Sequence, residues 1–190
     1  MFGRQHQREN GERALEHATR GDFEAIFKED MGALHMLAFL LTADQAKAEQ
    51  CFVAGLEESI RENPVFRQWA RSWSKRVIIK NAIKMMSPRP GQANPFAPSP
   101  KAHQGSSERD VLIGLVLELP PFERFVFVIS VLEGHSVSDC ASLLGCTITE
   151  LTRARSQALT DIALTRAGAA AAPQAQRASS ARFVARLEMA

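Results

Sequence analysis

The stretch from Ser136 to Leu159 reads SVSDCASLLGCTITELTRARSQAL, and it predicts two short helices joined by a tight turn. It contains two pairs of residues three positions apart, Ser136 with Asp139 and Thr147 with Glu150. At this spacing a side chain caps the first turn of a helix, although the first pair has Asp where Glu is usual. Each pair therefore predicts the start of a helix.

The apolar spacing of this stretch agrees with two helices that cross at a steep angle. Gly145 lies where the first helix must end, because glycine adopts the left-handed backbone without steric cost. Ala141 is small at the expected crossing point, and Cys140 and Cys146 are interpreted as small core residues rather than metal ligands. The apolar positions are Val137, Cys140, Ala141, Leu144, Cys146, Leu151 and Ala154.

This pattern is typical of a helix-turn-helix, whose second helix enters the major groove of DNA. The second helix is predicted from Ile148 to about Leu164. Its candidate DNA contacts are the polar residues Thr147, Thr149, Thr152, Arg153 and Arg155. The alternative is a plain helical hairpin that binds nothing, and the sequence leaves it open.

On the N-terminal side of this stretch, residues 87–107 hold five of the nine prolines and show no apolar periodicity. We interpret them as a semi-stiff linker between two independently folded units. Residues 10–86 and 108–165 both show helical spacing, so the predicted fold is all-α, with two small helical domains. Residues 166–190 form an Ala-rich tail without expected fixed structure.

Residues 64–89 include many cations and no acidic residue. Trp69 and Trp73 fall on an apolar stripe and are interpreted as core, although an exposed aromatic ring could also stack on an unpaired base. The cations lie on another face, for which we favour nucleic-acid phosphates over plain solvation. The candidates are Arg67, Arg71, Lys75, Arg76, Lys80 and Lys84.

The overall composition is ordinary for a folded protein, with 190 residues, 45% hydrophobic and 23% charged residues, and a net charge of +2. No apolar run is long enough to span a bilayer and no secretory signal is recognised, so we expect a cytoplasmic protein that does not bind membranes. No phosphate loop, paired carboxylates or nucleophile elbow is found. We therefore predict no enzyme activity, no metal and no cofactor.

The C-terminal unit resembles region 4 of the extracytoplasmic-function (ECF) group of bacterial sigma-70 factors. The family pattern L-P-x-x-x-R-x-V-F corresponds to Leu119, Pro120, Arg124, Val126 and Phe127. The helix-turn-helix keeps further family residues, namely Gly134, Ser136, Ala141, Leu144, Gly145, Thr147 and Ala158. The resemblance implies that this domain reads the minus-thirty-five promoter element.

The N-terminal unit resembles region 2 of the same family less closely. The family motif A-E-D-x-x-Q-E-x-F, which binds the polymerase clamp, matches outright only at Ala48 and Glu49. Gln50, Val53 and Ala54 replace an acid and two polar residues, which should weaken polar docking. The family motif W-L-x-x-I-A-R-N, which melts the minus-ten element, is similar in character to Trp69, Ala70, Trp73, Ser74, Lys75 and Arg76.

The resemblance predicts a sigma factor that directs transcription initiation by binding core RNA polymerase and promoter DNA. Polymerase contacts are expected at Glu49 and Gln50. The alternative is a sigma-like DNA-binding or protein-binding regulator that no longer docks on polymerase. Whether an anti-sigma factor is a further partner is left open.

Overall fold

The computed structural model describes residues 17–61, 65–92 and 107–187, with side chains described as far as residue 167. The described residues are helical, apart from turns and one isolated bridge between His17 and Phe66. This confirms the all-α prediction. Residues 93–106, most of the predicted linker, lie outside the described residues, as do Asn63 and Pro64.

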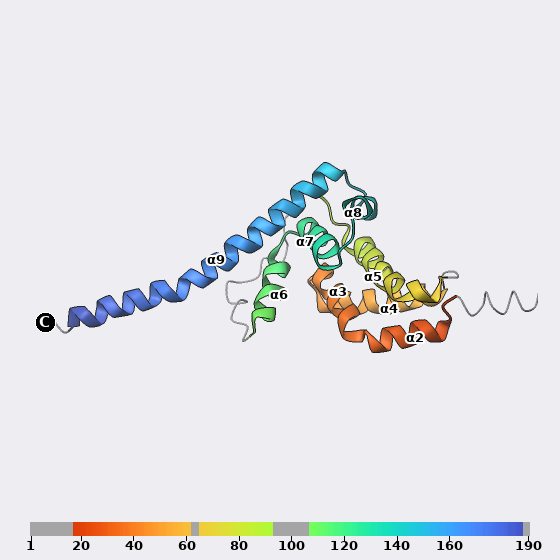
Figure 1. Ribbon diagram of the computed structural model, residues 1–190, viewed down its shortest axis with the longest axis horizontal. Helices are drawn as coiled ribbons and strands as arrows, with labels where there is room; N and C mark the ends of the chain where they lie inside the picture. The colour runs from red at the N-terminus through yellow and green to blue at the C-terminus, as the bar shows by residue number, and fades with distance from the viewer. Residues whose placement is uncertain (1–16, 62–64, 93–106, 188–190) are drawn as a thin grey trace, which may run out of the picture.

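The N-terminal half, residues 17–92, is a small helical bundle. Its elements are α2 (Arg20–Glu29), α3 (Met31–Thr42), α4 (Gln45–Arg61), the short 3-10 helix η1 (Arg67–Trp69) and α5 (Ala70–Met86). Helix α4 lies against both α3 and α5, as Figure 1 shows. Gly55 faces Ile78 where α4 meets α5, and a Cβ atom at Gly55 would lie 2.6 Å from the Ile78 Cδ1 atom. The glycine thus allows these helices to approach closely.

The C-terminal half begins at residue 107. It comprises α6 (Glu108–Glu118), α7 (Pro121–Phe127), the π-helical segment η3 (Val128–Leu132), α8 (Val137–Leu144) and α9 (Ile148–Leu187). Helix α7 is buried along most of its length and contacts α9 on one side. Pro121 opens α7, where the missing N–H of proline leaves no helical bond unmade.

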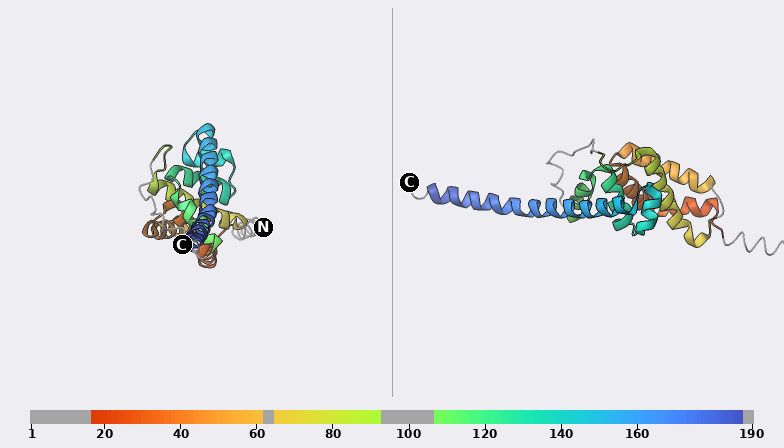
Figure 2. Two further views of the ribbon diagram at one scale, coloured as in Figure 1. Left: turned by 90° about the vertical axis from the view of Figure 1, so that its left-hand side faces the viewer. Right: turned by 90° about the horizontal axis from the view of Figure 1, so that it is seen from above.

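The two halves pack against each other and share one hydrophobic cluster. Helix α3 contacts α6, α7 and η3, so the leucines of α3 and the aromatic residues of α7 belong to the same core. Figures 1 and 2 show the C-terminal half lying against one end of the N-terminal bundle. Where the sequence predicted independent units, the structure therefore places an interface, because the apolar surface of α3 is wider than its own bundle covers.

Arg124 lies at this interface and is the largest fully buried side chain, with only 1% of its surface exposed. Its Nε atom donates to the carbonyl of Leu41 in α3 at 3.3 Å. Its Nη1 atom donates to the carbonyls of Leu117 and Leu119 at 3.3 and 3.2 Å. Burial lowers the pKa of the guanidinium to about 10, so it remains charged at neutral pH. One cation thus connects the end of α3 to the segment that precedes α7.

Helix α9 is longer than the sequence predicted. The expected helix ended near Leu164, whereas α9 continues to Leu187 and takes in most of the tail for which no fixed structure was expected. Alanine has the highest helix propensity, so an alanine-rich segment prolongs a helix that has already formed. Figure 2 shows α9 extending away from the rest of the molecule. Over the described ranges, no helix is both long and apolar enough to cross a membrane.

Candidate nucleic-acid interface

Helices α8 and α9 are joined by a turn whose predicted caps are all present. Ser136 Oγ accepts a hydrogen bond from the backbone N–H of Asp139 at 3.1 Å, which caps α8. Gly145 has φ 61° and ψ 37°, so it takes the left-handed conformation that ends α8. Thr147 and Glu150 form the reciprocal capping box, with backbone-to-side-chain distances of 2.8 and 3.2 Å. These bonds fix where α9 begins.

The buried side of α9 packs on α7 and α8 through residues spaced three or four apart, namely Leu151, Ala154 and Ala158. Cys140 of α8 is also fully buried, as predicted, and burial is the main cause of its raised thiol pKa. Cys146 is half-buried, and burial raises its pKa too. Neither thiol is therefore ionised at neutral pH, which suits core residues. In the described part of the chain, no group of three or more His, Cys, Asp or Glu residues could hold a metal ion.

The opposite side of α9 carries most of the predicted DNA contacts. Thr147, Thr149, Thr152 and Arg153 are exposed, whereas Arg155 is half-buried. Arg153 forms no ion pair or hydrogen bond with any residue whose side chain is described. The Thr152 hydroxyl donates to the Ile148 carbonyl at 2.8 Å, so its lone pairs stay available as acceptors.

Two features of this surface were not predicted from the sequence. Ile148 is 59% exposed at the start of α9, where an apolar side chain could contact a thymine methyl group. Glu150 places a negative charge beside it, and the backbone N–H of Thr147 lowers the pKa of its carboxyl group. The capping pattern was recognised, but its consequence for the charge of the DNA-facing surface was overlooked.

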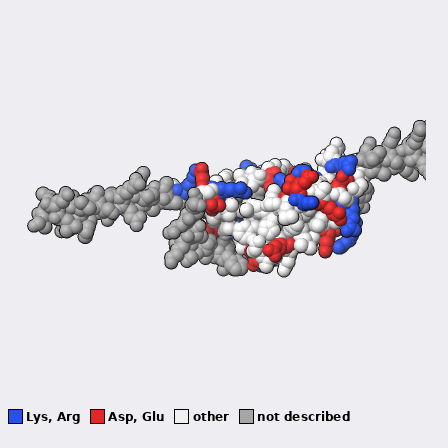
Figure 3. All heavy atoms as spheres, turned by 90° about the horizontal axis from the view of Figure 1, so that it is seen from below, with Lys and Arg blue, Asp and Glu red and all other residues white. Residues whose placement is uncertain are grey.

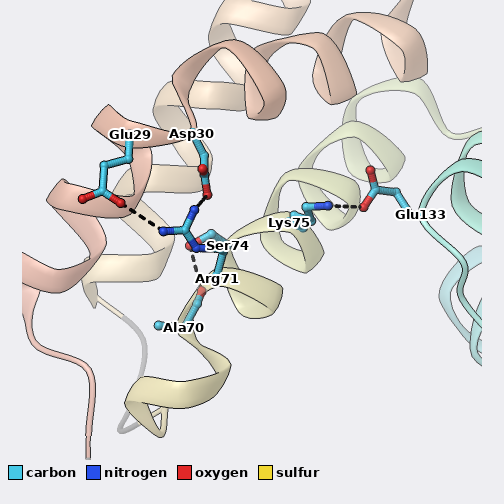
Figure 4. A network of polar contacts seen from close by, with 7 residues as sticks. All are labelled: Glu29, Asp30, Ala70, Arg71, Ser74, Lys75 and Glu133. Carbon is cyan, nitrogen blue, oxygen red and sulfur yellow. Dashed lines mark hydrogen bonds and ion pairs between the residues drawn. The ribbon is translucent and has the colours of Figure 1, made fainter.

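Most cations of the predicted basic helix are paired with acidic residues of other elements, as Figure 4 shows for Arg71 and Lys75. Arg71 binds Asp30, and its Nη2 atom lies 3.0 Å from Glu29 Oε2. Lys75 Nζ lies 2.7 Å from Glu133 Oε2, a residue of the C-terminal half. The other pairs are Arg67 with Asp22 at 2.6 Å, Lys80 with Glu58 at 3.7 Å and Lys84 with Glu58 at 3.4 Å.

The N-terminal half therefore presents no uniformly positive face. Arg76 is the member of the predicted set that makes no ion pair with a described residue, and it is half-buried. On the face shown in Figure 3, acidic and basic side chains lie next to one another. The sequence gave the cations correctly, but their partners are far away in the chain and could not be identified from local charge.

The interpretation of both tryptophans as core was wrong for Trp69, which is 56% exposed. Helix α5 begins only at Ala70, so Trp69 belongs to the preceding 3-10 turn and does not follow the buried stripe. Phe66 lies edge-on to it at a centroid distance of 5.2 Å and stacks on His17 at 4.7 Å. Trp73 is half-buried. His17, Phe66 and Trp69, here termed the aromatic cluster, form an exposed surface beside Arg67.

The residues predicted to contact polymerase lie together on the outer face of α4. Glu49 and Gln50 are exposed, and Val53 is 54% exposed. They line a surface hollow together with Ala46, Ala54 and Glu57. The face is thus apolar at its centre and acidic at its edges.

No protein-family model matches the chain. Two curated relatives match it, both named ECF RNA polymerase sigma factor SigM, from the Erdman and H37Rv strains of Mycobacterium tuberculosis. Each is 27% identical over 154 residues, which covers 76% of this chain and 78% of the relative. The chain is an ECF sigma factor.

Among solved structures, this sigma factor is similar to the sigma factor RpoE of Bartonella quintana, solved in complex with the anti-sigma factor NepR. The two are 18% identical with a TM-score of 0.44, and the match covers 74% of this chain and 94% of that chain. Membership of the ECF sigma factors places the protein among transcription regulators rather than enzymes.

Proposed function

We propose that this ECF sigma factor reads the minus-thirty-five element of a promoter through α9. The observation that carries the proposal is the two-sided character of this helix. Leu151, Ala154 and Ala158 anchor one side in the core, while Thr149 and the unpaired Arg153 face outward. An arginine can donate two hydrogen bonds to a guanine edge, and threonine contacts either base edges or phosphates.

The test is duplex binding by Arg153→Ala and Arg155→Ala. Each arginine that contacts a base edge should lose about 1 to 3 kcal/mol of binding free energy on truncation. Fluorescence anisotropy with labelled promoter fragments, selected from the protein's own genome, measures this loss. The matched control is Arg166→Ala, which removes the same charge from α9 where Arg166 pairs with Glu108. Unchanged affinity and salt dependence in both test variants would show that α9 does not face DNA.

For the minus-ten element, we propose that the aromatic cluster and the cations of α5 hold the melted strand. Exposed aromatic rings stack on unpaired bases of any sequence. The ion pairs of the cations do not prevent this, because exposed pairs contribute roughly 0 to 1 kcal/mol and a phosphate can replace a carboxylate. Candidate contacts are Arg67, Arg71, Lys75, Arg76, Lys80 and Lys84.

Core RNA polymerase is the proposed partner of the outer face of α4, through Glu49 and Gln50. A pull-down with purified core polymerase tests this, because Glu49→Lys should reduce capture by reversing a charge at the contact. Glu24→Lys is the control, since Glu24 lies on α2 and pairs with Arg20. The exposed Val53 favours a second function, that of a regulator which binds DNA without polymerase. A wild-type chain that binds duplex DNA but is never captured would establish that alternative. An anti-sigma factor is a further proposed partner.

A further inference from the structure

The arrangement of the two halves bears on access to α9. A cleft of about 730 Å³ separates the turn before α9 from the end of α5 and the residues that follow it. Gly145, Cys146 and Glu150 line one wall, while Lys84 and Arg89 lie on the other. The first turn of α9, which carries Thr147 and Thr149, therefore begins at the rim of a narrow space.

Duplex DNA needs more room than this cleft provides. A major groove that receives a helix is about 12 Å wide and 8.5 Å deep, with a sugar-phosphate ridge on each side. A ridge beside the first turn of α9 would have to enter the cleft, whose volume of about 730 Å³ is less than a ridge and its hydration require. Docking of α9 thus requires α5 to move away from the turn.

Two polar contacts hold α5 and α3 in this closed arrangement. Lys75 of α5 pairs with Glu133 at 2.7 Å, and Glu133 lies between η3 and α8. The Lys75 side chain is 43% exposed and that of Glu133 is 17% exposed, so the pair is partly shielded from solvent. Arg124 adds the buried hydrogen bond to the Leu41 carbonyl. Each contact joins one half of the molecule to the other.

We propose that this closed arrangement is an autoinhibited state, in which the Lys75–Glu133 pair and Arg124 hold α5 against the turn and duplex DNA binds only after the halves separate. The proposal rests on the proposed function of α9. The apparent affinity for DNA is then the intrinsic affinity reduced by the small fraction of open molecules. A change that weakens the latch raises this fraction and with it the affinity.

Lys75→Gln is the decisive variant, because charge and latch predict opposite effects. Removal of a cation should weaken binding to a polyanion. Loss of the latch should strengthen binding, by about two- to five-fold if the pair contributes as partly exposed pairs do. Glu133→Gln should show a similar gain. Both side chains are partly exposed at the surface, so the full-length variants are expected to fold.

Two controls carry the same charge changes without touching the latch. Lys80→Gln removes a cation of α5 that pairs within the N-terminal half, and it should bind more weakly. Glu108→Gln removes an acid that pairs with Arg166 within the C-terminal half, so any gain it shows measures charge alone. Affinity is measured by anisotropy with a labelled pool of roughly 30-base-pair duplexes of mixed sequence at low salt, where phosphate contacts dominate. Small-angle X-ray scattering of the same proteins reports opening as a larger radius of gyration.

Tighter binding together with a larger radius for Lys75→Gln supports autoinhibition. Binding by Lys75→Gln that falls as it does for Lys80→Gln overturns it. Variants that open but bind the duplex no better than wild type also overturn autoinhibition, while the proposed function of α9 stands. If neither wild type nor the opened variants bind any duplex, the proposed function itself has failed and autoinhibition of DNA binding falls with it.

Discussion

Trp69 lies with its ring more than half exposed beside Phe66, and this position gives the residue a different role from the one its spacing suggested. Apolar periodicity places Trp69 on the same stripe as Val77, but periodicity holds only inside a helix. The 3-10 turn η1 lies before α5 and turns the ring outward. Residue type and position were therefore read correctly from the sequence, whereas the direction of the side chain depended on a helix start that the sequence did not mark.

Trp69→Ala should weaken binding to single-stranded minus-ten DNA by about 1 to 3 kcal/mol, the range found for the loss of a base-stacking aromatic. The free energy of unfolding should change little, because the ring is 56% exposed. Binding of a labelled oligonucleotide and urea denaturation measure the two quantities. Trp69→Phe, which keeps an aromatic face, should retain most of the affinity. Equal losses in both variants would argue against stacking.

At the level of elements, the caps and breakers of the sequence located most helix ends. The caps at Ser136 and Thr147 and the left-handed Gly145 were predicted and are confirmed. The end of α9 was not predicted, because the Ala-rich tail was treated as low-complexity sequence and its helix propensity was disregarded. Local signals thus predict where helices begin better than they predict how far a favourable composition extends them.

Gly145→Ala should destabilise the turn between α8 and α9. Gly145 has φ 61°, and a left-handed backbone costs a residue with a Cβ atom roughly 1 to 2 kcal/mol. The free energy of unfolding should fall by about this amount, together with duplex binding if α9 loses its position. Gly32→Ala is the control, because Gly32 lies inside α3 with open space around it, and alanine there should be neutral or slightly stabilising. Equal stability of the two variants would contradict the role given to Gly145.

At the level of the whole molecule, the packing of one half on the other could not be derived from the sequence. The Pro-rich stretch correctly suggested two helical units, but it carries no information about whether they touch. The acceptor of Arg124 in α3 lies 83 residues earlier in the chain, and Lys75 pairs with Glu133 over 58 residues. Similarly, the partners of the other paired cations lie 22 to 45 residues away. Such long-range pairs determine which charges of the candidate DNA surface are free.

Arg124→Met should lower the free energy of unfolding by about 3 kcal/mol, because three buried carbonyl acceptors lose their donor while the volume of the side chain is largely kept. Urea denaturation followed by circular dichroism measures the loss. Arg109→Met is the control, since Arg109 is an exposed arginine on α6 and its loss should cost less than about 0.5 kcal/mol. A similar small effect at Arg124 would mean that its carbonyl contacts are replaced by water.

The position of Arg124 also has a consequence during synthesis on the ribosome. Leu41 emerges 83 residues before Arg124, and at about 5 to 20 residues per second this delay lasts roughly 4 to 16 s. Throughout it, the part of α3 that α7 later covers faces solvent, together with the carbonyl at the end of α3. The nascent chain therefore carries a sticky leucine-rich surface for seconds, which makes it a client for chaperones that shield such surfaces until translation is complete.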